Sequence, residues 1–99
     1  MRPYEIMIIL DPELEEKSLP KHLERYLKVI TSAGGTIDNQ DFWGKRHLAY
    51  DIKKRSEGYY VVINFTSEPE AAKEMDRLLG LAESVLRTKL LRAAEALEA

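Results

Sequence analysis

The fold is decided around the stretch SEGYYVVINF, residues 56–65. Its first three residues, Ser56, Glu57 and Gly58, predict a turn, and the β-branched and aromatic run from Tyr59 to Phe65 predicts a strand. A long extended region, residues 36–52, comes before this turn. The middle of the chain is therefore predicted to hold two consecutive strands.

A helix is predicted before this pair of strands. The sequence SLPKHLERYLKVITSAGG, residues 18–35, repeats its apolar residues at helical spacing. Ser18 is a plausible N-cap, and Gly34 with Gly35 ends the helix, because glycine suits the left-handed residue that follows a helix. The apolar stripe comprises Leu19, Leu23, Tyr26, Leu27 and Ile30.

A second helix is predicted after the pair. Ser67 and Glu70 have the spacing of a capping box, and Gly80 ends the pattern. A first strand and a last strand are also predicted: YEIMIIL, residues 4–10, and VLRTKLLR, residues 85–92.

The order strand, helix, strand, strand, helix, strand is that of the split βαβ, ferredoxin-like fold. We expect an α+β protein with a four-stranded antiparallel sheet and both helices on one sheet face. Residues 1–92 are predicted to form one domain, and residues 93–99 a short, mobile C-terminal tail.

Composition excludes several classes of protein. Apolar residues make up 44% and charged residues 32% of the 99 residues, as in an ordinary globular domain. Without cysteine there is no disulfide framework and no thiolate metal site. No apolar run reaches the length of a membrane span, and no signal peptide is recognisable. We therefore expect a cytoplasmic protein.

Alternation along the strands predicts which face each residue occupies. The residues expected to face the helices are Tyr4, Ile6, Ile8, Leu10, Leu48, Tyr50, Ile52, Tyr59, Val61, Ile63, Phe65, Leu86, Thr88 and Leu90. Those expected on the free face are Glu5, Met7, Ile9, Lys45, His47, Tyr60, Val62, Asn64, Arg87, Lys89 and Leu91. This mixture of apolar and basic groups predicts a docking surface. The expected partner-binding residues are Met7, Ile9, Trp43, Tyr60, Val62 and Leu91.

Catalytic patterns are missing from the sequence. The histidines, His22 and His47, have no nucleophile at a recognisable spacing, and the acids of DPELEE, residues 11–16, lack the periodicity of a calcium loop. We interpret those acids as a solvated loop and His22 as a surface residue. No glycine-rich phosphate loop precedes a helix. The sequence predicts neither an enzyme nor a cofactor or metal site.

Charge is segregated along the chain. The formal net charge is -2, yet residues 42–55 carry a net charge of +4. Two interpretations of this basic strand stay open: the cations contact nucleic-acid phosphates, or they deter an edge strand from aggregating. The RNA-recognition motif matches poorly. Val61 stands where the second stacking aromatic would fall, and Tyr59 is expected to point into the core.

The window GKRHLAYDIK, residues 44–53, resembles the signature of bacterial small-subunit ribosomal protein six. The opening MRPYEIMIIL, with Arg2, Tyr4 and Glu5, is also similar to that family, as are EGYYVVINF and SVLRTKLLR. The resemblance implies a ferredoxin-like, non-enzymatic protein. It would bind the central domain of small-subunit ribosomal RNA as a heterodimer with ribosomal protein eighteen.

Two features depart from the family. The tail is short, and position 47 is His where the family frequently has Arg, so that a permanent charge becomes a titratable one. The resemblance favours RNA contact for the basic strand. The expected RNA-binding residues are Arg2, Lys45, Arg46, His47, Lys53, Lys54, Arg87, Lys89 and Arg92.

Other functions remain open on this fold. The main alternative is a small-molecule-sensing or homo-oligomeric interaction domain, and a plain protein–protein adaptor is a third. Under the preferred interpretation no membrane and no small-molecule substrate is involved.

Overall fold

A computed structural model describes residues 1–93 and has the predicted order of elements. The strands are β1 (Arg2–Leu10), β2 (Thr36–Ile52), β3 (Arg55–Ser67) and β4 (Val85–Arg92). The helices are α1 (Leu19–Ser32) and α2 (Pro69–Leu81), and a short 3-10 helix, η1 (Glu16–Ser18), leads into α1. The tail predicted to be mobile, residues 93–99, lies outside the described residues except for Ala93.

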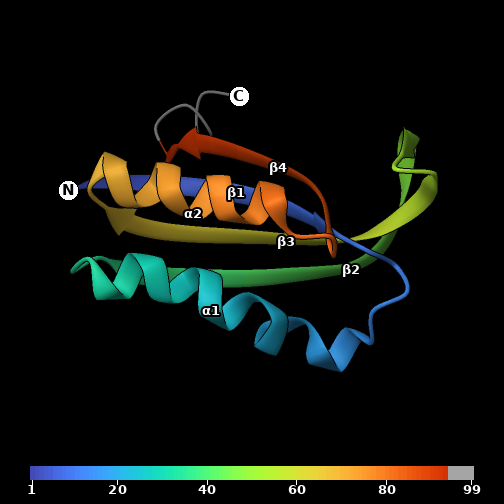
Figure 1. Ribbon diagram of the computed structural model, residues 1–99, viewed down its shortest axis with the longest axis horizontal. Helices are drawn as coiled ribbons and strands as arrows, with labels where there is room; N and C mark the ends of the chain where they lie inside the picture. Colours follow the sequence, from blue (N-terminus) through green and yellow to red (C-terminus); the bar gives the residue numbers. More distant parts are fainter. Residues whose placement is uncertain (94–99) are drawn as a thin grey trace.

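The four strands form one sheet in the order β2-β3-β1-β4, and every neighbouring pair is antiparallel. Both helices lie on the same face of this sheet (Figure 1). The predicted ferredoxin-like α+β architecture is therefore confirmed. Within the described residues, no helix is long and apolar enough to cross a membrane.

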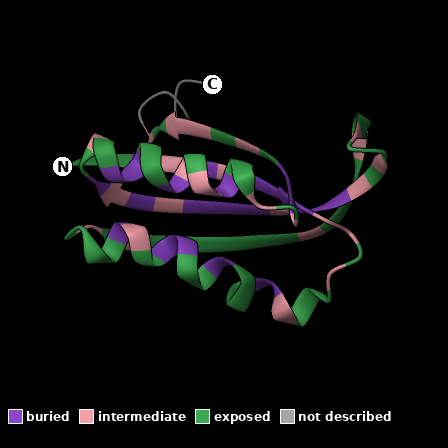
Figure 2. Ribbon diagram, in the orientation of Figure 1, coloured by how far each residue is buried: buried purple, intermediate pink, exposed green. Residues whose placement is uncertain are grey.

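The core lies between the sheet and the two helices. Buried residues follow β1 and β3 and the sheet-facing sides of both helices (Figure 2). Ile6, Ile63 and Phe65 are completely buried, and the ring of Phe65 stacks on that of Tyr4 with centroids 5.4 Å apart. The alternation in β1 and β3 thus predicted the core face correctly, and Tyr59 points into the core as expected.

The helix ends agree only in part with the sequence signals. Gly34 has a φ of 88° just after α1, as predicted for a left-handed residue. The predicted capping box of Ser67 and Glu70 is wrong, because Glu68 is the N-cap of α2. Ser67 belongs to β3, and its hydroxyl donates to the carbonyl oxygen of Glu68. Ser18 is the N-cap of α1, but its hydroxyl donates to the carbonyl oxygen of Glu15 and caps no helix N–H. The second helix also continues past Gly80 to Leu81.

The turn between β2 and β3 was predicted three residues too late. Ile52 pairs with Arg55, so the two-residue turn is Lys53-Lys54. Ser56, Glu57 and Gly58, expected to form that turn, belong to β3. The cause is backbone conformation, because both lysines adopt positive φ and close the hairpin without glycine.

The face assigned to the end of β2 was wrong. Leu48, Tyr50 and Ile52, expected to face the helices, line a groove on the opposite sheet face, and Tyr50 is 60% exposed. The hairpin projects past the end of β1 and curves (Figure 1), and the register of β2 shifts between His47 and Ile52. Its apolar residues therefore meet the free face, where no helix lies.

Three more residues differ from the predicted faces. Lys45 and His47 were expected on the free face, but they pair with Tyr59 and Glu57 and lie on the helix side. The ammonium group of Lys45 lies 5.3 Å from the centroid of the core-facing Tyr59 ring. Leu86 is buried but lies outside the core cluster, where Val85 takes its place. The shift in register between Ile9 and Leu10 in the β1–β4 pair accounts for that exchange.

Two tyrosines test these corrected faces. Tyr59→Ala removes a ring that is 7% exposed and should lower the free energy of unfolding by about 3–5 kcal/mol, as for other large buried aromatics. Tyr50→Ala removes a ring that is 60% exposed and should cost about 1 kcal/mol or less. Urea denaturation of both variants measures the difference. Equal losses would place Tyr50 back in the core.

Candidate nucleic-acid interface

The tip of the β2–β3 hairpin presents two lysines from a strained turn. Lys53 has a φ of 49° and Lys54 a φ of 66°. Two-residue hairpin turns with positive φ at both positions favour Asn-Gly, because a side chain disfavours this backbone conformation. Non-glycine residues in the left-handed region are enriched at functional sites. The turn thus places two lysine residues at the tip at a conformational cost.

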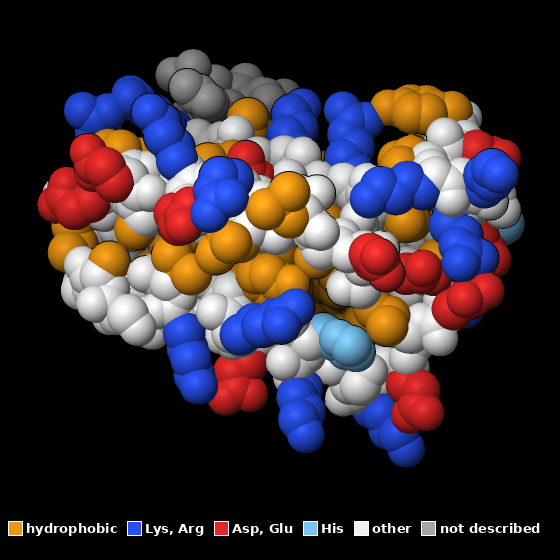
Figure 3. Space-filling model, viewed as in Figure 1, with side chains coloured by type: hydrophobic (Ala, Val, Ile, Leu, Met, Phe, Trp, Pro, Cys, Tyr) orange, Lys and Arg blue, Asp and Glu red, His pale blue; other side chains and the backbone are white. Residues whose placement is uncertain are grey.

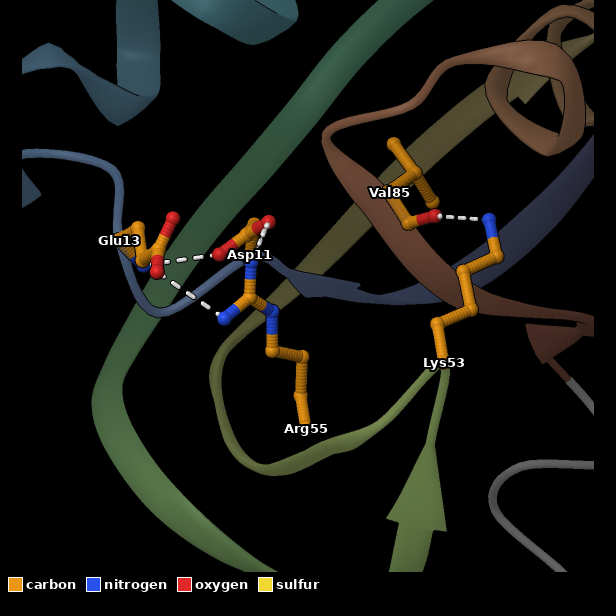
Figure 4. A network of polar contacts seen from close by, with 5 residues as sticks. All are labelled: Asp11, Glu13, Lys53, Arg55 and Val85. Atoms are coloured by element: carbon orange, nitrogen blue, oxygen red, sulfur yellow. Dashed lines mark hydrogen bonds and ion pairs between the residues drawn. The ribbon is translucent and has the colours of Figure 1, made fainter.

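Polar contacts fix the hairpin against the end of the sheet (Figure 4). The Lys53 ammonium donates to the carbonyl oxygen of Val85 at 3.0 Å. The Arg55 guanidinium forms ion pairs with Glu13 at 3.0 Å and with Asp11 at 3.6 Å. These contacts join the hairpin to the start of β4 and to the loop after β1, so the tip is held in one orientation.

Those anchors were not expected from the sequence. Asp11 and Glu13 were interpreted as part of a solvated loop, yet both pair with Arg55 from 42–44 residues along the chain. The only signal was opposite charge in two loops that the ferredoxin-like topology brings to the same end of the sheet. Arg55 therefore has a positional role and is not among the candidate RNA contacts.

The curved hairpin encloses a groove on the free face, with a volume of about 240 Å³. Met7 and Ile9 come from the sheet, and the guanidinium of Arg87 donates a hydrogen bond to the Tyr50 hydroxyl. The other lining residues are Leu48, Ala49, Ile52, Tyr60 and Lys89. One end of the free face is therefore covered by the chain itself, although no helix reaches it.

Burial reduces the expected partner-binding surface. Ile9 and Val62 lie on the free face but are 3% and 9% exposed, so a partner could contact little of either. Met7, Tyr60 and Leu91 are partly exposed, and Trp43 is 45% exposed. Of the six expected partner-binding residues, only those four present accessible apolar area.

Trp43 is held in a defined orientation at the edge strand. Its ring lies parallel to that of Tyr60, with centroids 6.2 Å apart and an angle of 4°. The indole N–H donates to the carboxylate of Asp41 at 2.9 Å, and the guanidinium of Arg46 lies 5.7 Å from the indole centroid. Gly44, with a φ of 87°, forms the bulge that permits this arrangement.

The nine expected RNA-binding residues are all exposed, but they do not form one cluster. Arg2 and Arg92 lie at the end of β1 opposite the hairpin. The free face carries Arg46, Arg87 and Lys89, whereas the β2 edge carries Lys45 and His47 on its helix side and the tip carries Lys53 and Lys54. β1 spans about 26 Å at 3.3 Å per residue, so the two ends would contact different phosphates.

Within the described residues, no three metal-ligating side chains gather into a metal site. The same residues contain no buried side-chain nitrogen or oxygen that lacks a hydrogen-bond partner. The chemistry that this surface offers is cationic and aromatic contact.

Comparisons with known proteins agree on one family. The model of the ribosomal protein S6 family matches residues 3–92. A small ribosomal subunit protein bS6 from Pseudarthrobacter chlorophenolicus is 58% identical over 95 residues, which cover 96% of this chain and 94% of the relative. A bS6 protein from Beutenbergia cavernae is 59% identical over 92 residues, covering 93% of this chain and 96% of the relative.

A solved structure supports the same assignment. The crystal structure of 30S ribosomal protein S6 from Thermotoga maritima superposes with a TM-score of 0.84 at 31% sequence identity. The match covers 98% of this chain and 92% of that one. The similarity therefore extends over the whole fold, including the hairpin.

Lys54→Gly tests the strain in the turn. Glycine adopts positive φ without penalty, so this variant should raise the free energy of unfolding by about 0.5–1 kcal/mol. Lys28→Gly is the matched control on the exposed side of α1, where glycine should instead cost about 1 kcal/mol. Urea titrations give both values. A loss of stability in Lys54→Gly would mean that the turn is unstrained.

Proposed function

Because this chain belongs to the ribosomal protein S6 family, we propose that it binds the central domain of small-subunit ribosomal RNA together with ribosomal protein eighteen. Family membership makes it a protein of the small ribosomal subunit. Its relatives are named as ribosomal proteins, which are not enzymes, and the sequence-based expectation of a non-enzymatic protein is thereby confirmed.

The observation that carries the RNA-binding proposal is the strained basic hairpin. A chain of net charge -2 places Lys53 and Lys54 side by side in left-handed backbone, and hydrogen bonds and ion pairs then fix their position. A turn that served only to reverse the chain would be more stable with Asn-Gly. Fixed cations at a protruding tip are suited to contact phosphates.

Further cations extend this surface on both sides of β2. Arg46 lies over Trp43 on the free face, and Lys45 lies over Tyr59 on the helix side. Arg87 and Lys89 flank the groove beneath the hairpin. His47 lies at the same edge. Arg2 and Arg92 would contact a separate part of the RNA at the far end of β1.

The heterodimer is supported by the remaining exposed apolar surface. Met7, Trp43, Tyr60 and Leu91 present apolar area to solvent on the face that no helix covers. Apolar side chains that remain exposed on one face are typical of an interaction site. The net negative charge of this chain would favour encounter with a basic partner such as ribosomal protein eighteen. Ile9 and Val62, which are buried, would support the contact surface from below.

We further propose that residues 1–92 form a single ferredoxin-like domain and that the protein works in the cytoplasm as part of the ribosome. The family model matches nearly this whole range, residues 3–92.

RNA contact at the hairpin is tested by Lys45→Ala with Arg46→Ala. Both side chains are exposed, so the fold should be spared. Two lost phosphate contacts should lower the magnitude of the log–log salt slope of RNA binding by roughly 1.4–1.8. Filter binding to a central-domain ribosomal RNA fragment measures the slope. Lys73→Ala with Arg77→Ala on α2 removes the same net charge and should leave it unchanged. Equal slopes in all three proteins would reduce the basic strand to a solubility device.

Partner docking is tested by Trp43→Glu. Trp43 is 45% exposed, so the charge should not unfold the domain but should abolish capture of ribosomal protein eighteen in a pull-down. Val62, although central, is unsuitable because it is buried and a charge there would destabilise the sheet. Leu81→Glu, at a 69% exposed leucine on α2, is the control and should leave capture intact. Undiminished capture by Trp43→Glu in a folded protein would exclude this face.

A further inference from the structure

A second basic region lies on α1, on the side of the molecule opposite the groove. Residues 17–28 carry four Lys or Arg and one acid, a net charge of +3. The flanking segments are acidic, with net charges of -4 over residues 1–16 and -2 over residues 29–41. Three of these cations, Lys21, Arg25 and Lys28, follow i, i+4, i+7 spacing and share one helix face.

The other helix shows what an ordinary solvated helix surface looks like in this protein. On α2, Arg77 forms a two-pronged ion pair with Glu74, with distances of 2.7 and 3.0 Å. The hydrogen bond from Arg77 lowers the pKa of the Glu74 carboxyl. By contrast, Lys21, Arg25 and Lys28 form no ion pair with any residue that the structure describes. These three cations on α1 thus have no carboxylate in ion-pair contact among the described residues.

These cations surround a hollow of about 690 Å³ between α1 and the loop before β4. Its other polar groups include the hydroxyls of Ser18 and Ser84 and the imidazole of His22. Glu24 is the one acid in the lining, and Tyr26 completes it. The helix side of the molecule, with Lys and Arg side chains along α1 at the lower edge, is visible in Figure 3. Three cationic side chains therefore line the hollow against a single carboxylate.

Arg25 is already oriented without a carboxylate. Its guanidinium donates to the hydroxyl of Tyr26 at 2.8 Å and lies 4.9 Å from the centroid of the same ring. Tyr26 itself is 8% exposed and belongs to the core. Guanidinium has five N–H donors, so this anchoring leaves donors for an external acceptor. A fixed guanidinium loses less freedom when it binds a phosphate.

We propose that this hollow, the α1 cation hollow, binds phosphate groups of a second RNA segment, distinct from the RNA contacted by the hairpin. Lys21 to Lys28 extend over about 10 Å along the helix, which is sufficient for consecutive backbone phosphates. The helices lie on one sheet face and the groove on the other, so the α1 cation hollow and the groove face opposite sides of the sheet. The chain would thus join two RNA segments. This inference rests on the proposed function for the identity of the polyanion.

The test uses two double variants that remove equal charge from the two helices. Lys21→Ala with Lys28→Ala removes two of the three cations from the α1 cation hollow and keeps the Arg25–Tyr26 contact. Alanine is a good helix former at both exposed positions. Lys73→Ala with Arg77→Ala on α2 is the matched control. Each protein is titrated against a central-domain ribosomal RNA fragment in the presence of ribosomal protein eighteen. Salt dependence and hydroxyl-radical footprints are both recorded.

We expect the α1 variant to lower the magnitude of the salt slope by roughly 1.4–1.8 and to lose one footprint. That footprint should differ from the one lost by Lys45→Ala with Arg46→Ala, and the α2 control should change neither. A slope and footprints equal to those of the α2 control would overturn the α1 site, while an effect of the hairpin variant would still leave the proposed function standing. Loss of the same footprint in the α1 and hairpin variants would also overturn it. No RNA binding by the unaltered protein would overturn the proposed function and this inference together.

Discussion

The sheet has two apolar faces and helices for only one of them, and much of the structure follows from this constraint. β1 and β3 lie at the centre of the sheet, where Ile9 and Val62 point away from the helices yet remain buried. Exposing such residues to water would be unfavourable at about 25 cal/mol per Å² of apolar area. The β2–β3 hairpin curves over one end of that face, and Leu48, Tyr50 and Ile52 cover part of its apolar area.

The position of the hairpin also determines where charge can be presented. Its tip reaches past the sheet, and only a two-residue turn with positive φ at Lys53 and Lys54 closes it in this register. Arg55 is paired with the carboxylates of Glu13 and Asp11, whereas Lys53 donates to the neutral Val85 carbonyl and keeps its positive charge. Basic residues in one short motif therefore have different roles. Some fix the hairpin, and others, such as Lys54 and Arg46, are directed outward.

Prediction from the sequence succeeded where the alternation of apolar residues and the burial of apolar area favour the same sheet face. In β1 and β3, alternation and burial agree, so Ile6, Ile63 and Phe65 were placed correctly, as was the ferredoxin-like order of elements. It failed at Tyr50 because alternation defines two faces but does not say which one meets the helices. It also failed at the turn, because Gly58 is the stronger local signal while the long-range contacts of Lys53 and Arg55 decide the register. The sequence identified the individual basic residues. Only the structure shows that they lie at two ends of β1 and on two faces of the sheet.

A small net charge does not prevent strong local interactions with a polyanion, because charges are screened over short distances. At physiological ionic strength the Debye length is about 8 Å, whereas the molecule extends 36 × 29 × 21 Å. The acids at the two ends of the sequence therefore weaken the field of the hairpin or of α1 only where they lie close to it. Asp11 and Glu13 do lie close, and they bind Arg55, the cation that positions the hairpin. Within the described residues, the outward-facing cations of the tip and of α1 have no such carboxylate. Ion pairs thus neutralise the cation that fixes the hairpin, while the cations that could bind a phosphate have no carboxylate in contact. The net charge of the chain is therefore a poor guide to its partners.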